Sequence, residues 1–167
     1  STAALAFGGA PTPSTGDKTE TWNGSNWTET SDLSTKRALL TGAGTTTSAL
    51  ASGGYTTAYV GVNELYNGTS WTEVADLNTS RGYASQTAGS NNTSALVVGG
   101  TPDTANTEVW NGTAWTELNN MPAVRVNAAG AGTTSSALIA GGRNPNLTNT
   151  SLEWNDPVIS TKTADTD

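Results

Sequence analysis

The sequence predicts an all-β protein built from β-propeller blades, with four antiparallel strands in each unit of ~44 residues. Three observations support this prediction. A phrase with two aromatic residues recurs every 44 residues, an apolar stretch ends in Gly-Gly once per unit, and an Asn-Gly pair separates two strand-like runs. The chain of 167 residues holds about four such units.

Composition favours short strands over helices. Only 34% of the residues are hydrophobic and 13% are charged, whereas 19 glycines and abundant Thr suit short strands joined by tight turns. Six Trp argue against a disordered chain, because disordered segments are poor in aromatic residues. No stretch shows helical periodicity over a useful length.

Charge and residue content exclude several classes of partner. Seven Lys and Arg stand against 14 Asp and Glu, a net charge of −7, so a phosphate backbone would be repelled and no nucleic acid partner is expected. The chain has no Cys and therefore neither a disulfide nor a thiolate metal site. No run of apolar residues is long enough to cross a bilayer, so no membrane partner is expected.

The Gly-Gly stretches mark one predicted strand in each unit. They read AALAFGG, SALASGG, SALVVGG and SALIAGG, and their glycines are Gly8, Gly9, Gly53, Gly54, Gly99, Gly100, Gly141 and Gly142. The intervals between the pairs are 45, 46 and 42 residues, and most of this variation falls between the glycines and the aromatic phrase. The segments that follow the Gly pairs are therefore predicted to be loops.

The aromatic phrase predicts the other hairpin of each unit. Its three copies are TWNGSNWTET, LYNGTSWTEV and VWNGTAWTEL. The units are centred on the first aromatic residues, Trp22, Tyr66, Trp110 and Trp154, and the second aromatic residues are Trp27, Trp71 and Trp115. Asn-Gly between two strands predicts a type I′ turn, which needs positive φ at both central residues.

The second unit illustrates the expected order of elements. A strand follows Arg37, a polar turn leads into the Gly-Gly strand, and a variable loop leads into the aromatic hairpin. The predicted segments are 38–44, 45–47, 48–54, 63–67 and 70–74.

The quoted residues resemble a known repeat. An apolar strand ending in Gly-Gly, then an aromatic residue and a Trp, resembles the kelch repeat, although kelch-like sequences usually have a longer turn between the last two. The sequence looks closer still to kelch-like repeats in predicted structural proteins of marine tailed phages, especially cyanophages. The segments that carry this resemblance are WNGTAWTEL, Arg125 and AGAGTTSSALIAGG. The resemblance implies a virion-surface or extracellular location, with other virion proteins or further copies of the chain as partners.

The repeated side chains are expected to have structural roles. The paired aromatic residues would pack between blades, each ring burying ~150–250 Å²; the alternative is a platform on which sugars stack. The arginines that recur at 44-residue steps would each pair with a carboxylate of their own or the next blade. These are Arg37, Arg81 and Arg125.

No catalytic residue, metal site or cofactor is expected. The absence of His and Cys excludes Ser-His-Asp triads, Cys nucleophiles and most transition-metal sites. Paired carboxylates could serve a glycosidase, but Glu20, Glu64 and Glu108 occur once per unit, and a residue repeated in every blade is usually structural. Loop Asp and Asn residues could hold Ca²⁺, yet their spacing matches no known calcium loop.

Two function classes stay open. The first is a non-catalytic structural or adhesive module acting through protein–protein contacts, assembly or attachment to host-surface glycans. The second is a secreted carbohydrate-active enzyme or lectin, which should have a pocket with carboxylates that are not repeated. In the first class the loops after the Gly pairs would carry the contacts, through Asp17, Tyr55, Tyr59, Asp103, Arg143, Asn144 and Asn146.

The two ends of the sequence depart from the repeat. Residues 1–155 form the repeat region and 156–167 a degenerate tail, in which Ile159 stands where the second Trp would fall. The first unit lacks its Arg-led strand. We therefore expect part of a larger or oligomeric propeller, in which Ala3–Gly9 pairs with a strand from outside this segment or Trp154 packs on another subunit.

Overall fold

The computed structural model describes residues 2–9, 16–88, 92–144, 146–155 and 158–162, and it contains no helix within them. The strands are β1 (Ala4–Phe7), β2 (Thr19–Trp22), β3 (Trp27–Glu29), β4 (Thr41–Thr45), β5 (Ser48–Ser52), β6 (Asn63–Tyr66), β7 (Trp71–Val74), β8 (Ser85–Ala88), β9 (Ala95–Val98), β10 (Thr107–Trp110), β11 (Trp115–Leu118), β12 (Ala129–Gly132), β13 (Ser136–Ala140), β14 (Arg143–Asn144), β15 (Asn146–Leu147), β16 (Ser151–Asn155) and β17 (Val158–Lys162).

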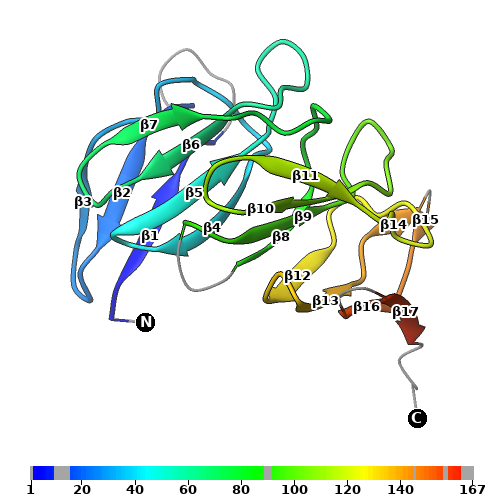
Figure 1. Cartoon of the computed structure of the whole chain (residues 1–167). Helices are drawn as coiled ribbons and strands as arrows, with labels where there is room; N and C mark the ends of the chain where they lie inside the picture. The colour runs from blue at the N-terminus through cyan, green and yellow to red at the C-terminus, as the bar shows by residue number, and fades with distance from the viewer. Residues whose placement is uncertain (1, 10–15, 89–91, 145, 156–157, 163–167) are drawn as a thin grey trace.

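These strands form four antiparallel blades, which confirms the predicted all-β repeat (Figure 1). Blade 1 has the three strands β1–β3, blade 2 has β4–β7, and blade 3 has β8–β11. Blade 4 has the order β12-β13-β16-β17, and the short hairpin β14–β15 lies in its loop. Its last strand, β17, comes from within residues 156–167.

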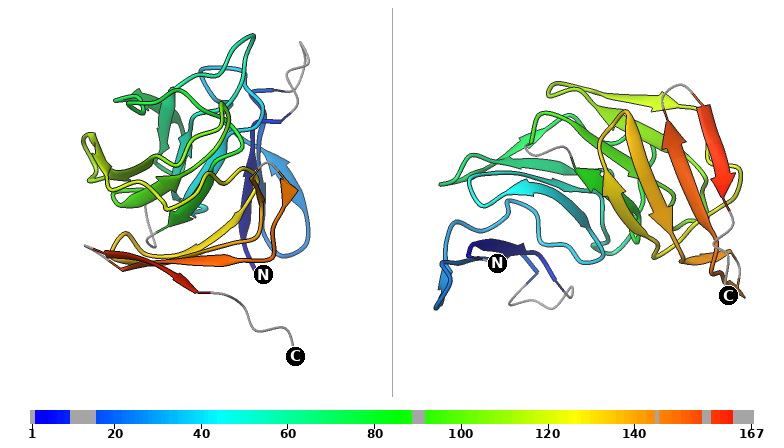
Figure 2. Two further views of the ribbon diagram at one scale, coloured as in Figure 1. Left: turned by 90° about the vertical axis from the view of Figure 1, so that its right-hand side faces the viewer. Right: turned by 90° about the horizontal axis from the view of Figure 1, so that it is seen from below.

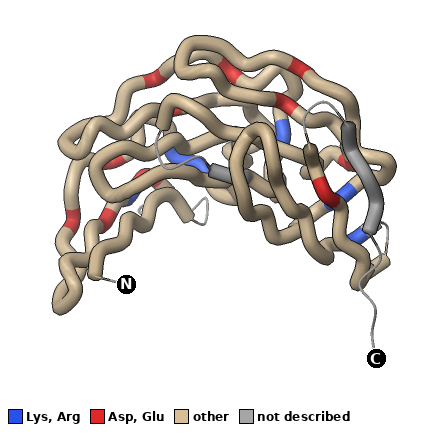
Figure 3. The backbone as a smooth tube through the Cα atoms, turned by 60° about the horizontal axis from the view of Figure 1, so that its bottom comes forward, with Lys and Arg blue, Asp and Glu red and all other residues tan. Residues whose placement is uncertain are grey.

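The blades form an open, propeller-like arch. Blades 2, 3 and 4 meet through their first strands, because β4 contacts β8 and β8 contacts β12. Figures 2 and 3 show blade 1 at one end of the arch and blade 4 at the other, without closure into a ring. Among the described residues, blades 1 and 4 therefore each have a neighbouring blade on one side.

The aromatic pairs occupy facing positions on the two strands of one hairpin, as predicted. Trp22 lies opposite Trp27, Tyr66 opposite Trp71, and Trp110 opposite Trp115. Their ring centroids are 5.6, 5.0 and 5.4 Å apart, within the range of favourable ring contacts. Cross-strand ring packing therefore supports each of these hairpins.

The turn between the paired aromatic residues is not the predicted type I′ turn. In the first hairpin four residues, 23–26, separate the strands, and only Gly24 has positive φ there. The side-chain Oδ1 of Asn23 accepts hydrogen bonds from the backbone N–H groups of Ser25 and Asn26, both at 2.9 Å. The prediction failed because this side chain caps the turn, so Asn needs no left-handed backbone.

The first strand of each complete blade begins later than the sequence pattern predicts. The predicted strand at 38–44 begins instead at Thr41, because Leu39 has φ of 59° and interrupts the extended backbone. Tyr83 and Asn127 have the same conformation in the next blades. The N–H of Tyr83 donates to the carbonyl of Leu39, and that of Asn127 to the carbonyl of Tyr83, both at 3.0 Å. The left-handed residues thus link consecutive blades.

The hydrophobic core lies between blades. One cluster packs Leu5 and Phe7 of blade 1 against Tyr66 and Trp71 of blade 2, and two similar clusters lie between blades 2 and 3 and between blades 3 and 4. Trp27 on the outer side of blade 1 is 49% exposed, whereas Trp71, Trp110, Trp115 and Trp154 are buried. The aromatic residues therefore pack as predicted wherever a neighbouring blade covers them.

In blades 2 and 3 the first glycine of the Gly pair allows the next blade to approach closely. A Cβ on Gly99 would lie 2.2 Å from the carbonyl oxygen of Arg125, and one on Gly53 would lie 2.4 Å from that of Arg81. Both glycines have left-handed φ, 64° and 62°. The residue after Gly99, Gly100, donates its N–H to the same Arg125 oxygen at 2.8 Å. Any side chain at these positions would push the next blade away.

We expect Gly99→Ala to destabilise the protein more than Gly141→Ala. Both glycines are left-handed, so each Ala carries ~1–2 kcal/mol of backbone strain. Among the described residues a Cβ at Gly141 would meet nothing closer than the Thr148 carbonyl oxygen at 3.7 Å, whereas one at Gly99 would lie 2.2 Å from the carbonyl oxygen of Arg125, which leads into blade 4. Urea denaturation of the two variants measures the difference. Equal losses of stability would contradict the role of the blade contact.

Candidate functional site

The loops and the arginines lie at one end of every blade. In blade 2, Thr41 at the start of β4 pairs with Ser52 at the end of β5, and Asn63 at the start of β6 pairs with Val74 at the end of β7. The loop after the Gly pair and the connector from the preceding blade therefore meet at this end. We call it the loop face; the Asn-Gly turns lie at the opposite end.

Buried ion pairs hold the connectors against the blades. Arg81 Nη2 lies 2.7 Å from Glu108 Oε1, and Arg37 forms the equivalent pair with Glu64. All four side chains are fully buried. Each arginine leads the first strand of a blade, and each glutamate lies on the third strand of the same blade. The pairing of Arg37 and Arg81 predicted from the sequence therefore lies within a blade.

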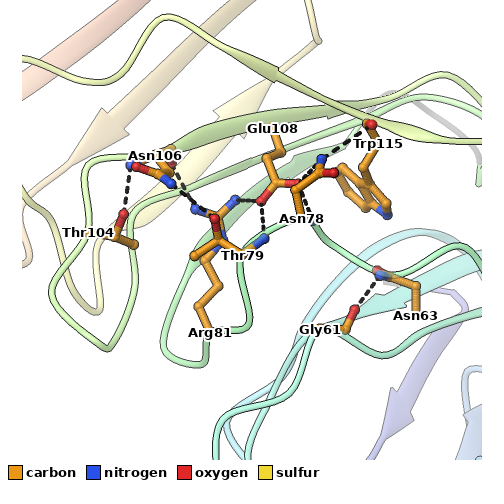
Figure 4. A network of polar contacts seen from close by, with 9 residues as sticks. All are labelled: Gly61, Asn63, Asn78, Thr79, Arg81, Thr104, Asn106, Glu108 and Trp115. Carbon is orange, nitrogen blue, oxygen red and sulfur yellow. Dashed lines mark hydrogen bonds and ion pairs between the residues drawn. The ribbon is translucent and has the colours of Figure 1, made fainter.

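The same carboxylates also bind backbone N–H groups of the connector. Glu108 accepts hydrogen bonds from the N–H of Asn78 at 2.7 Å and of Thr79 at 3.2 Å, and from the Asn78 side-chain amide at 2.8 Å (Figure 4). Arg81 Nη1 donates to the carbonyl of Asn106 at 3.0 Å. With their lone pairs engaged and no contact with solvent, these glutamates cannot reach a substrate.

Burial lowers the pKa of Arg81 from its ordinary value, and the charges of Glu108 and then Glu117 oppose this shift. The lowered pKa means that burying the Arg81 charge without a partner would be unfavourable. The ion pair is stable as a unit, and removing either partner would leave a buried charge without compensation.

Among the described residues, blade 4 has no equivalent ion pair, so the pairing predicted for Arg125 is not found there. The position of Glu108, opposite Val97, corresponds in blade 4 to Leu152, opposite Ile139. Arg125 donates instead to the Thr150 hydroxyl at 2.7 Å and to the carbonyl of Val124 at 3.0 Å. The physical reason is visible in the sequence SLEWN, where the glutamate is displaced by one residue and faces the other side of the strand.

An aromatic hollow of about 640 Å³ lies on the loop face. It is lined by Phe7, Gly9, Ala38, Leu39, Leu40, Tyr55 and Tyr83, which come from blades 1, 2 and 3. Tyr59 packs edge-on against Tyr55, with ring centroids 5.2 Å apart. The structure thus brings Tyr55 and Tyr59 together, as two of the predicted contact residues.

Sequence reasoning missed Tyr83, which belongs to a connector and not to a loop after a Gly pair. A signal was present, because the residue two positions after the repeated arginine is Leu39, Tyr83 or Asn127 and so varies within an otherwise regular register. Only the left-handed backbone at this position explains why the side chain reaches the hollow rather than the blade interior.

The remaining predicted contact residues divide into two places. Asp103, Arg143 and Asn144 line a smaller hollow of about 100 Å³ with Val124 and Val126. Asn146 pairs with Asn144 across the hairpin β14–β15 and is exposed. Asp17 lies apart from them, in blade 1, where its carboxylate is 3.4 Å from Lys36 Nζ.

Within the described ranges, no group of three or more His, Cys, Asp or Glu side chains could hold a metal ion. None of the described residues belongs to a helix that could span a membrane. Comparison of the chain with models of known protein families and with curated protein sequences finds no match. The site is therefore interpreted from its own geometry.

We expect Arg81→Ala to destabilise the protein much more than Arg125→Ala. The first change leaves Glu108 buried without its cation, which costs ~3–5 kcal/mol. The second removes described hydrogen bonds to neutral groups, because Leu152 occupies the strand position that Glu108 has in blade 3. Free energies of unfolding from urea titrations give the comparison. Equal losses would show that the carboxylate of Glu108 is not what makes Arg81 important for stability.

Proposed function

We propose that this chain is a non-catalytic structural and adhesive module of kelch-like β-propeller blades, on the surface or an appendage of a phage particle. It takes part in assembly and in attachment to a host-surface glycan. The observation that carries the glycan-binding part of this proposal is the aromatic hollow on the loop face, with Tyr55 and Tyr83 in its wall. The phage location follows from the resemblance of the repeat.

The disposition of carboxylates supports a binding role over a catalytic one. Glu64 and Glu108 form buried ion pairs, and the described residues that line the aromatic hollow include no Asp or Glu. Most enzymes that hydrolyse glycosidic bonds use two carboxyl groups that flank the scissile bond. A hollow with apolar and aromatic walls can hold a sugar without cleaving it.

The chemistry of the hollow suits a carbohydrate. The faces of sugar rings present C–H groups that pack on aromatic rings, and a tyrosine supplies both an apolar ring and a polar hydroxyl. Tyr55 and Tyr83 come from consecutive blades, so the arrangement of the blades sets the distance between the two rings. Both are partly exposed and available to a ligand.

A secreted carbohydrate-active enzyme or lectin is the second candidate. The observation that favours it is Asp103, a carboxylate that is not repeated in the other units and that lines the smaller hollow beside Arg143. The described lining of that hollow holds this single carboxylate, which is one short of the pair that a glycosidase uses. A lectin with an anionic or amide-bearing sugar fits this hollow better than an enzyme.

We expect Tyr55→Ala and Tyr83→Ala each to weaken glycan binding about tenfold, the effect of ~1.4 kcal/mol for a lost ring contact. Calorimetric titration with purified bacterial surface polysaccharides measures the affinity. Trp27→Ala is the matched control, because Trp27 is also exposed but lies beside the turn at the opposite end of blade 1. The glycan proposal fails if neither tyrosine matters or if all three variants weaken binding equally.

Exchanging a loop should change recognition and leave folding intact. Residues 143–149 can be replaced by the sequence of residues 55–61, because both segments follow a Gly pair and have the same length. We expect altered binding to cells or polysaccharide with an unchanged circular dichroism spectrum, since the framework between blades is untouched. Binding that survives replacement of all four loops, 9–18, 55–61, 101–106 and 143–149, would remove the loop face from the proposal.

A further inference from the structure

Blade 1 has a free strand edge where every other blade has an Arg-led strand. The pairing of Ala4 with Trp22 matches that of Ala49 with Tyr66, so β1 corresponds to β5. β5, β9 and β13 each pair on their other side with a first strand, β4, β8 and β12. Among the described residues no strand pairs with that side of β1.

A groove of about 410 Å³ lies along this edge, between β1 and β4. Ala4, Leu5 and Phe7 line one side, and residues 40–46 line the other. β4 contacts β8, and β8 contacts β12, so the place beside β4 is where the first strand of a preceding blade would lie. The groove therefore lies where the first strand of blade 1 would be expected, with β1 on one side and β4 on the other.

Glu20 gives this groove a specific chemistry. It lies opposite Ala6 and Glu29, just as Glu64 lies opposite Ala51 and Glu73. Glu64 is fully buried by Arg37 and by the N–H groups of residues 34 and 35, at 2.7 and 3.3 Å. Glu20 is exposed, and its carboxylate forms no hydrogen bond or ion pair with the described part of the chain.

The arginines of the described residues cannot fill this site. Arg37, Arg81 and Arg125 lead strands that are already paired in their own blades, and Arg143 lies in β14. We propose that the free edge of β1, with Glu20 as its anchor, is the acceptor for the Arg-led strand of a further repeat unit. This proposal does not depend on glycan binding at the loop face.

The acceptor also selects small side chains. Gly44, one residue before the end of β4, and Gly132, at the end of β12, could not carry a side chain, because a Cβ there would lie 2.1 Å from the Ser48 carbonyl or 2.3 Å from that of Ser136. The occupant therefore carries an arginine, two connector N–H groups ahead of it and a Gly-, Ala- and Thr-rich strand after it. Residues 34–45 of this chain have that chemistry and serve as its probe.

The test uses a synthetic peptide with the sequence of residues 34–45, added to the whole protein. Amide hydrogen exchange in Ala4–Phe7 is expected to slow on the order of tenfold at saturation, because a new strand covers the edge. A peptide with Ala in place of the arginine, and the variant Glu20→Gln with the original peptide, should lose most of this protection. Glu29→Gln is the control, since Glu29 is an exposed carboxylate that pairs with Lys18.

A fusion keeps the test decisive if the free peptide binds weakly. The same residues placed directly ahead of Ser1 reproduce the turn between β4 and β5, because Ser1 and Thr2 then take the places of Thr46 and Thr47. Slow exchange in the fusion and its loss in Glu20→Gln support the proposal. The proposal is overturned if amide exchange in Ala4–Phe7 stays fast with both the peptide and the fusion, or if the protection is the same in Glu20→Gln. It is also overturned if protection rises with protein concentration alone, because a second copy of the chain would then be the occupant.

Discussion

The buried pairing of arginine with glutamate is the interaction on which the complete inner blades depend. It is a costly arrangement in isolation, since both charges leave water, and its stability comes from the hydrogen bonds that surround it. The carboxylates of Glu64 and Glu108 each bind an arginine and two backbone N–H groups of the connector. One side chain on the third strand thereby sets the path of the chain as it enters the blade.

Packing between blades follows from this entry geometry. The connector positions the first strand so that its backbone contacts the backbone of the preceding blade. Gly53 lies against the carbonyl of Arg81, and Gly99 lies against the carbonyl of Arg125. Because each core cluster takes residues from two blades, a blade has no complete core of its own. The aromatic hollow is a consequence of the same arrangement, since it opens on the loop face with walls from three consecutive blades.

The sequence pattern was sufficient for the parts of the fold that repeat. The facing aromatic residues, the antiparallel order of the strands and the Gly-Gly strand ends were all predicted from the register of 44 residues. Two local details of the backbone were predicted wrongly. The Asn23 side chain caps a turn of four residues where a turn of two residues was predicted. The left-handed backbone of Leu39 makes β4 begin at Thr41, later than predicted. Both errors arise where a hydrogen bond or a neighbouring blade overrides the local preference.

The sequence by itself determined which side chains belong to the repeated framework, because register and residue type suffice to identify equivalent positions. It could not determine what each equivalent position does, since that depends on which neighbours surround it. Glu20 and Glu108 occupy the same place in the unit, yet one is exposed and the other fully buried. Only the tertiary structure decided this, because burial, partner and access are set by the adjacent strand and blade, and these differ between the ends and the middle of the arch.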